Sequence, residues 1–349
     1  MVALFAKIFG SKAADLAKAK AEIAEIIPVV NESDDDTCSM DCGACTTSFP
    51  SSLKLSDEDD GNTVLWRSTA NYDLHCVVPT GKTDWIRDAT DVRGTVKKQI
   101  AEWSKSNTAT KLVGKDGERG SIKVSTSSLP LGDEMDPAYI NGTKADVLLL
   151  PYFVWVHGLT VDKVDSVLTE VVDILQKAQE DKSGDDTAEL AGETTKLAIG
   201  EAEETTTLLV GETEEATKLP VGEVQGFAVK ACGFQSHIFL CSHQTRDKRC
   251  GITAPIMKRE MEDILRDKDL LRDYGDDRAG GVKVSFVNHV GGHKYTANVM
   301  IYKKNGDMIW LARCHPKNVQ LILEESVLGK GRVWAEKVRL VQKTNPIAW

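Results

Sequence analysis

The sequence lacks the features that mark a membrane protein or a nucleic-acid-binding protein. Its longest apolar run, Val147 to Val156, is half the length a helix needs to cross a bilayer, and it contains Pro151. No Lys/Arg-rich run occurs, and 43 basic against 53 acidic side chains give a net charge of −10. An acidic chain has no general attraction to nucleic acid or anionic lipid. We therefore expect no membrane span and no nucleic-acid partner.

Export and transit signals are also missing. The first 28 residues hold no arginine, they carry acidic residues at Asp15, Glu22 and Glu25, and no long apolar centre is present. This pattern predicts a short amphipathic helix. We expect a cytoplasmic protein, with the nucleus as the next alternative and mitochondria less favoured. In a reducing compartment, the eight cysteines are expected to be ligands, reactive thiols or core residues rather than disulfides.

Length and composition predict two folded domains with a linker between them. The chain has 349 residues, and 41% of them are hydrophobic, which is enough for packed cores. Residues 1–70 are acidic and turn-rich with a cysteine motif, and 71–179 and 225–349 are patterned modules. Residues 180–224 repeat TKLAIGE, TTLLVGE and TKLPVGE, starting at Thr195, Thr206 and Thr217. Such short glycine-containing copies cannot bury a core, so this segment is predicted to be a flexible acidic linker.

Both patterned modules have an α/β order. In the first module, apolar runs predict strands and helical spacing predicts helices. The expected elements are strands at Leu74–Pro79, Ile122–Ser127 and Val147–Val156, with helices at 92–103 and 164–175.

The second module shows a similar order. Strands are expected at 235–241 and 282–287, and a hairpin around Asn305-Gly306. Pro255 is expected to open a helix, and a second helix is predicted from Pro316 to Leu328. This is the thioredoxin-like order. The predicted fold is therefore α/β, with two thioredoxin-like modules joined by the acidic linker.

Two residue pairs in the second module carry the chemistry. Cys241 and Cys250 are separated by eight residues, and His289 and His293 lie in the run His-Val-Gly-Gly-His. Strands joined by a crossover helix run parallel, so their carboxyl ends share one sheet edge, where ligands usually bind. Cys241 and His289 each follow such a strand, and the two glycines allow a tight backbone. The fold is therefore expected to bring both pairs together.

Two thiolates and two imidazoles suit zinc or a [2Fe–2S] cluster. Eight residues between the cysteines are too many for a zinc knuckle. Cys241-Ser242-His243 matches half of a Rieske motif, but nothing after Cys250 matches the other half, so a Rieske centre is rejected. A zinc-stabilised interaction module and a buried, metal-free cysteine pair stay as alternatives.

The motif Cys-Ser-His-x-x-Arg-Asp-x-Arg-Cys-Gly at 241–251, together with His-x-Gly-Gly-His at 289–293, resembles the sucrase/ferredoxin-like family of thioredoxin-like ferredoxins. The resemblance extends to Asp-Cys-x-x-Cys at 41–45, Ser-Phe-Pro at 48–50 and Thr-Gly-Lys-Thr-Asp-Trp at 80–85. Within that family it resembles the fungal actin-patch-distribution branch, which uses two Cys and two His.

The resemblance implies that Cys241, Cys250, His289 and His293 hold a [2Fe–2S] cluster, with both histidines on one iron. It implies an electron carrier or redox sensor rather than an enzyme with its own substrate, working with a redox partner such as a flavin reductase. Relatives in this family end in an aromatic residue that the cytosolic iron–sulfur assembly machinery reads, and Trp349 resembles that tail.

Other motifs give weaker signals. Arg246 and Arg249 in the ligand loop are expected either to stabilise the reduced cluster or dock an acidic reductase, or simply to pair with Asp247 or with other surface groups. Cys42 and Cys45 could form a reactive dithiol, which makes a thiol oxidoreductase a further alternative. The run Gly-Lys-Thr at 81–83 lacks the first glycine of a P-loop and is interpreted as a turn after a strand.

Overall fold

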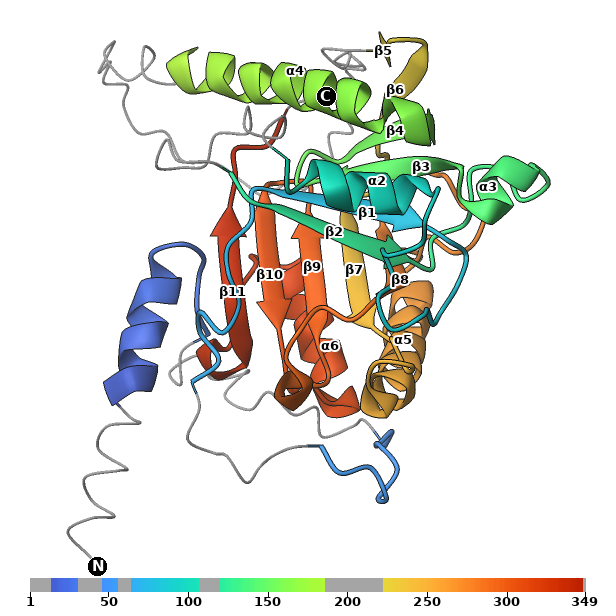
Figure 1. The fold of residues 1–349 in the computed structure, drawn as a ribbon. Helices are drawn as coiled ribbons and strands as arrows, with labels where there is room; N and C mark the ends of the chain where they lie inside the picture. Colours follow the sequence, from blue (N-terminus) through green and yellow to red (C-terminus); the bar gives the residue numbers. More distant parts are fainter. Residues whose placement is uncertain (1–13, 31–45, 56–63, 107–119, 186–221, 348–349) are drawn as a thin grey trace, which may run out of the picture.

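A computed structural model describes residues 14–30, 46–55, 64–106, 120–185 and 222–347, and its framework is one large mixed β-sheet covered by helices (Figure 1). Within those ranges the sheet has eleven strands in the order β11-β10-β9-β7-β8-β2-β1-β3-β4-β6-β5. The strands are β1 (Leu74–Pro79), β2 (Ile122–Ser127), β3 (Lys144–Leu150), β4 (Val154–Thr160), β5 (Glu223–Val224), β6 (Phe227–Ala231), β7 (Ser236–Cys241), β8 (Val282–Val287), β9 (Val299–Lys303), β10 (Asp307–Leu311) and β11 (Val338–Lys343). The helices are α2 (Val96–Trp103), α3 (Pro137–Asn141), α4 (Val164–Asp185), α5 (Lys248–Asp267) and α6 (Val319–Leu321), with a further helix at 14–24.

The two halves of the sheet repeat one strand order. β1 and β2 are parallel, with α2 between them in the chain, and β3 and β4 follow as antiparallel neighbours. β7 and β8 are likewise parallel around α5, and β9 and β10 follow in the same way. The halves join where Ser127 of β2 pairs with Val287 of β8. The fold is therefore mixed α/β as expected, while the division into two modules stays a prediction.

Three hydrophobic cores hold this arrangement together. Helices α2 and α4 cover the outer face of the first half-sheet, while α5 and the helical segment 316–328 cover that of the second, where the helix at 14–24 adds Ile23. The third core lies between the half-sheets, where Val77 and Leu148 of the first half meet Phe239 and Trp310 of the second. Burial of both faces explains the mainly apolar sequences of β1 and β3.

One predicted strand is wrong. The run from Val147 to Val156 forms two antiparallel strands, β3 and β4, in which Leu149 pairs with Val154. The chain turns at 151–153, where Pro151 cannot donate to the ladder and Phe153 has a φ of +56°. Because both strands are buried, no polar residue marks the turn, and the sequence pattern resembles one continuous strand.

The predicted linker at 180–224 falls largely outside the described residues. Helix α4 extends to Asp185, β5 begins at Glu223, and residues 186–221 are not described.

At the end of the chain, Ile347 is 6% exposed and packs into the core beneath α4, and Gln179 donates a hydrogen bond to the Asn345 carbonyl at 2.6 Å. Among the described helices, none combines the length and the apolar character that crossing a membrane requires.

Candidate metal centre

Cys241 is the last residue of β7, at the carboxyl end of the strand. Every side chain of β7 is buried, which places the Cys241 thiol at the edge of the core between the half-sheets. Cys241 is 2% exposed. The neighbouring strand β8 runs parallel to β7, so both strands deliver their following residues to one edge, as the sequence predicted.

Cys250 lies in the first turn of α5, and this corrects the predicted helix start. The helix begins at Lys248, because the Asp247 carboxylate accepts a hydrogen bond from the Arg249 N–H and caps it. Pro255 therefore lies inside α5 instead of opening it. The early start brings Cys250 (1% exposed) back toward Cys241, and it places the Cys250 thiol at the positive end of a 20-residue helix.

His289 follows β8 by two residues and begins a tight loop. Gly291 and Gly292 have φ values of +96° and +75°, a region that side chains disfavour, and a Cβ at Gly292 would lie 2.2 Å from the Tyr295 ring. These values confirm the expected role of the two glycines. His293 opens a short 3-10 turn, and its side chain lies outside what the structure describes.

Three predicted ligands come together. The Sγ atoms of Cys241 and Cys250 lie 3.4 Å apart, too far for a disulfide, and Cys241 Sγ lies 3.8 Å from His289 Nδ1. All three ligand atoms lie within 4.8 Å of one another. Two ligands on one tetrahedral metal with bonds of about 2.3 Å are separated by about 3.8 Å. The donor set and its spacing therefore fit a metal centre.

The electrostatics of the two cysteines differ. The pKa of the Cys241 thiol is held well below its usual value by the hydrogen bond with Cys250, and by His289 and the Val290 N–H, despite its burial. The pKa of Cys250 is raised, because its proton is held in the bond with Cys241 and the site is buried. One thiolate thus forms readily, while the second requires added positive charge, which a metal would supply.

Buried polar groups hold the two ligand loops in place. His243 is 1% exposed; its Nδ1 accepts the His289 N–H at 3.1 Å, and its Nε2 lies 2.9 Å from the Trp85 carbonyl, to which it donates. Arg339 of β11 donates to the Gly291 carbonyl at 3.1 Å and to Asn298 Oδ1 at 2.9 Å. His243 stands in the sequence only as part of the Cys-Ser-His motif, and Arg339 has no local sequence signal, so neither was predicted to hold a ligand loop.

The two arginines of the ligand loop bind nearby oxygens. Arg249 donates from Nε and Nη2 to the Asp247 carboxylate at 3.1 and 2.8 Å, which is the pairing alternative named for it. Arg246 donates to the Arg87 carbonyl at 3.3 Å. A role of either arginine toward a reduced cluster or a reductase stays a prediction.

The remaining cysteines and histidines are partly described. Cys232 and Cys314 are buried free thiols, as expected, and His237 contacts Cys232 at 3.3 Å. His157 Nδ1 lies 2.9 Å from the Asp146 carboxylate, and His315 caps a short helix, so both have structural roles. The cysteines at 38, 42 and 45, like the final tryptophan, lie outside the described residues.

Fold and site together define an α/β protein with a Cys/Cys/His group, its two cysteines buried, at the carboxyl ends of two parallel strands. The chain belongs to the sucrase/ferredoxin-like family, whose model matches residues 65–340. This confirms the resemblance in the two ligand motifs. The chain is 34% identical over 350 residues to actin patches distal protein 1 of Saccharomyces cerevisiae, covering 97% of each chain.

Two further similarities are partial. Altered inheritance of mitochondria protein 32 of Meyerozyma guilliermondii is 31% identical over 102 residues, which are 29% of this chain and 33% of that protein. Among solved structures, a thioredoxin-like [2Fe–2S] ferredoxin from Aquifex aeolicus matches 33% of this chain and 96% of its own, with 16% identity and a TM-score of 0.23.

Proposed function

We propose that this protein binds a [2Fe–2S] cluster through Cys241, Cys250, His289 and His293, and that it transfers single electrons or senses redox state. The observation that carries the proposal is the meeting of two cysteines and a histidine within 4.8 Å in a chain of the sucrase/ferredoxin-like family. When bound, such a cluster would accept and release one electron. His293 is included as the second histidine of the family motif.

The chain's own residues suit an anionic cluster. The amino end of α5 and the Val290 N–H both direct positive charge at the cysteine sulfurs. Hydrogen bonds to ligand sulfurs and neutral histidine ligands both make the reduced state less unfavourable than four thiolates would. A potential above that of four-cysteine ferredoxins follows.

Exposure indicates where electrons would enter. Cys241 and Cys250 are buried, whereas His289 is partly exposed and Gly292 is exposed. The histidine side of the site therefore faces solvent and would meet a redox partner, for which a flavin reductase is the proposed class. We propose that the chain acts in the cytoplasm as a carrier and not as an enzyme with its own substrate.

Zinc is the second candidate, and the same distances favour it. A separation of 3.4 Å between sulfurs and 3.8 Å between sulfur and nitrogen matches ligands on one tetrahedral ion. In that case the metal would stabilise the fold of an interaction module. A zinc-loaded protein would be colourless, whereas a [2Fe–2S] protein has visible charge-transfer absorption. The third candidate is a thiol oxidoreductase that uses Cys42 and Cys45. Its thiol-disulfide activity would persist after the cluster is lost, which distinguishes it from an electron carrier.

Serine substitutions test the ligand assignment. Cys241→Ser and Cys250→Ser should each abolish iron binding, because each removes a thiolate that the cluster needs. Cys232→Ser is the matched control, because Cys232 is also a buried thiol but contacts His237 and lies outside the group. Iron and acid-labile sulfide are measured on the purified proteins. Wild-type iron content in Cys241→Ser would refute the assignment.

A further inference from the structure

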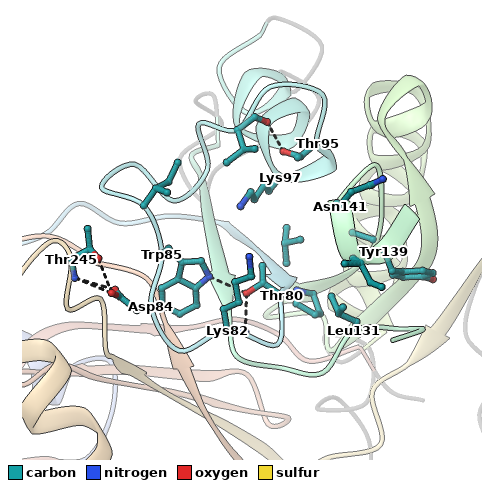
Figure 2. A pocket seen from close by; sticks show the side chains of 17 residues that line it. Thr80, Lys82, Asp84, Trp85, Thr95, Lys97, Leu131, Tyr139, Asn141 and Thr245 are labelled. Carbon is teal, nitrogen blue, oxygen red and sulfur yellow. Dashed lines mark hydrogen bonds between the residues drawn. The ribbon is translucent and has the colours of Figure 1, made fainter. Parts of the chain in front are cut away.

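A cavity of about 490 Å³ opens at the carboxyl end of β1 (Figure 2), and neither cysteine of the metal centre lines it. The loop after β1, with Thr80 and Lys82, forms one wall. The first turn of α2 brings Lys97 in from above, and residues around Tyr139 close the far side. Its volume lies within the range of small-molecule sites.

The position of this cavity corresponds to that of the metal centre. In the second half of the sheet, Cys241 at the end of β7 and Cys250 at the start of α5 form the site. In the first half, the end of β1 and the start of α2 line the cavity, and β1 is parallel to β2 as β7 is to β8. The carboxyl ends of parallel strands are the usual ligand-binding edge of an α/β sheet. At this edge the first half presents lysines and hydroxyls in place of thiols.

The cavity carries unbalanced positive charge. Lys82 and Lys97 both line it, and the pKa of Lys97 is lowered by burial and by the nearby Lys82. In the described part of the chain, neither ammonium has a carboxylate within 4.0 Å. The one acidic lining residue, Asp84, accepts the hydroxyl of Thr245, another lining residue, at 2.7 Å and keeps its charge, so the two lysines and Asp84 leave the lining with a net charge of +1. Two cations held together in a cavity fit a ligand with a doubly charged group.

The rest of the lining is apolar and aromatic. Trp85 is buried in the wall, with its Nε1 donating to Thr80 Oγ1 at 2.9 Å, and Tyr139 is buried opposite. Ile86 and Ile140 also line the cavity, yet they are 56% and 60% exposed, which is unusual for large apolar side chains. The cavity therefore offers an apolar surface beside its paired lysines.

We propose that this cavity binds a small organic phosphate of nucleotide size, with the phosphate between Lys82 and Lys97 and a planar ring against the apolar lining. A phosphate monoester carries nearly two negative charges at neutral pH, which matches two lysines. Binding does not depend on the metal centre, so it goes beyond the function proposed above.

The cavity and the metal centre share a loop. The segment 80–87 lines the cavity and also holds the 241–250 loop: the Thr83 carbonyl accepts the Ser242 hydroxyl at 2.6 Å, and the Trp85 carbonyl accepts His243 Nε2 at 2.9 Å. A ligand in the cavity would therefore contact the same segment that holds the connection between Cys241 of β7 and Cys250 of α5.

Isothermal titration calorimetry on the full chain tests the proposal. The probes are AMP and FMN, each compared with its phosphate-free form, adenosine or riboflavin. At least one phosphorylated probe should bind with a stoichiometry of one, about tenfold or more tighter than its phosphate-free form. Absence of binding by both AMP and FMN at millimolar concentration would overturn the proposal.

Lysine variants locate the site. Lys97→Ala and Lys82→Ala should each weaken binding about tenfold or more, while Lys97→Arg should retain most of it. Lys98→Ala is the matched control: it removes the same charge from the same helix, but Lys98 pairs with Asp91 and does not line the cavity. Circular dichroism verifies that each variant is folded. Equal weakening by Lys98→Ala, or equally tight binding of the phosphate-free probe, would contradict the phosphate site.

Discussion

Replacing Arg339 with methionine should destabilise the protein and loosen the histidine loop. The guanidinium is 2% exposed and donates four hydrogen bonds, two to Ser68 and one each to the Gly291 carbonyl and Asn298 Oδ1. It also stacks over Tyr295 at 4.2 Å. Methionine fills similar volume but donates nothing, so the partly buried acceptors at Ser68 and Gly291 would lose their partner.

The magnitude follows from those acceptors. An unsatisfied buried carbonyl costs about 1–3 kcal/mol; the Ser68 and Gly291 carbonyls are only partly buried, so losing both bonds would cost about 2–4 kcal/mol. Burial lowers the pKa of Arg339 to about 10, which shows that its charge is partly unfavourable there, so relief of that burial offsets part of the loss. We expect the free energy of unfolding to fall by about 3 kcal/mol.

Urea unfolding followed by circular dichroism measures this change. Arg278→Met is the matched control, because Arg278 forms an exposed ion pair with Asp276 and should cost less than about 1 kcal/mol. Metal release to a chelator should also be faster in Arg339→Met than in Arg278→Met, since Gly291 lies in the ligand loop. Equal stability of the two variants would refute this reasoning.

Three further changes have defined outcomes. Burial lowers the pKa of His237 to about 3, so the unfolded chain binds more protons between pH 3 and 6.5 and stability falls as the pH drops below 6.5. Between pH 7.5 and 5.0, the free energy of unfolding measured in urea should therefore fall by about 2 kcal/mol less in His237→Phe than in wild type. An equal fall in both proteins would contradict a buried, neutral His237. Asp247→Ala should lower the free energy of unfolding by about 1 kcal/mol in the same assay, because it removes the cap of α5, whereas Asp247→Asn should not lower it. Equal losses of stability in the two variants would exclude capping. Deleting Trp349 should lower cluster occupancy in cells but leave reconstitution of the purified protein intact, whereas impaired reconstitution would make Trp349 a packing residue.

Local patterns predicted most of the elements around the site. The strands β1, β2 and β8 have the predicted bounds, because an apolar run, as in β1, and alternation of apolar and polar residues, as in β2 and β8, are both strong strand signals. Topology then predicted that Cys241 and His289 would share an edge, and the distance of 3.8 Å between them agrees. This step needed only parallel strands around a helix and no knowledge of side-chain contacts.

Contacts between distant segments could not be predicted in this way. The pairing of β2 with β8 joins edges far apart in the sequence, and no local pattern marks it. The capping by Asp247 overrode the signal from Pro255, so the predicted start of α5 was wrong. Arg339 resembles an ordinary surface arginine in a strand, and only the fold brings it to the Gly291 carbonyl.

The most direct test of the central claim is electron paramagnetic resonance of the protein purified without oxygen and reduced with dithionite. A [2Fe–2S] cluster predicts a single spin-one-half signal, with two irons and two sulfides per chain, that is lost in Cys241→Ser and retained in Cys232→Ser. A colourless protein that contains zinc and gives no signal would contradict the proposed cluster.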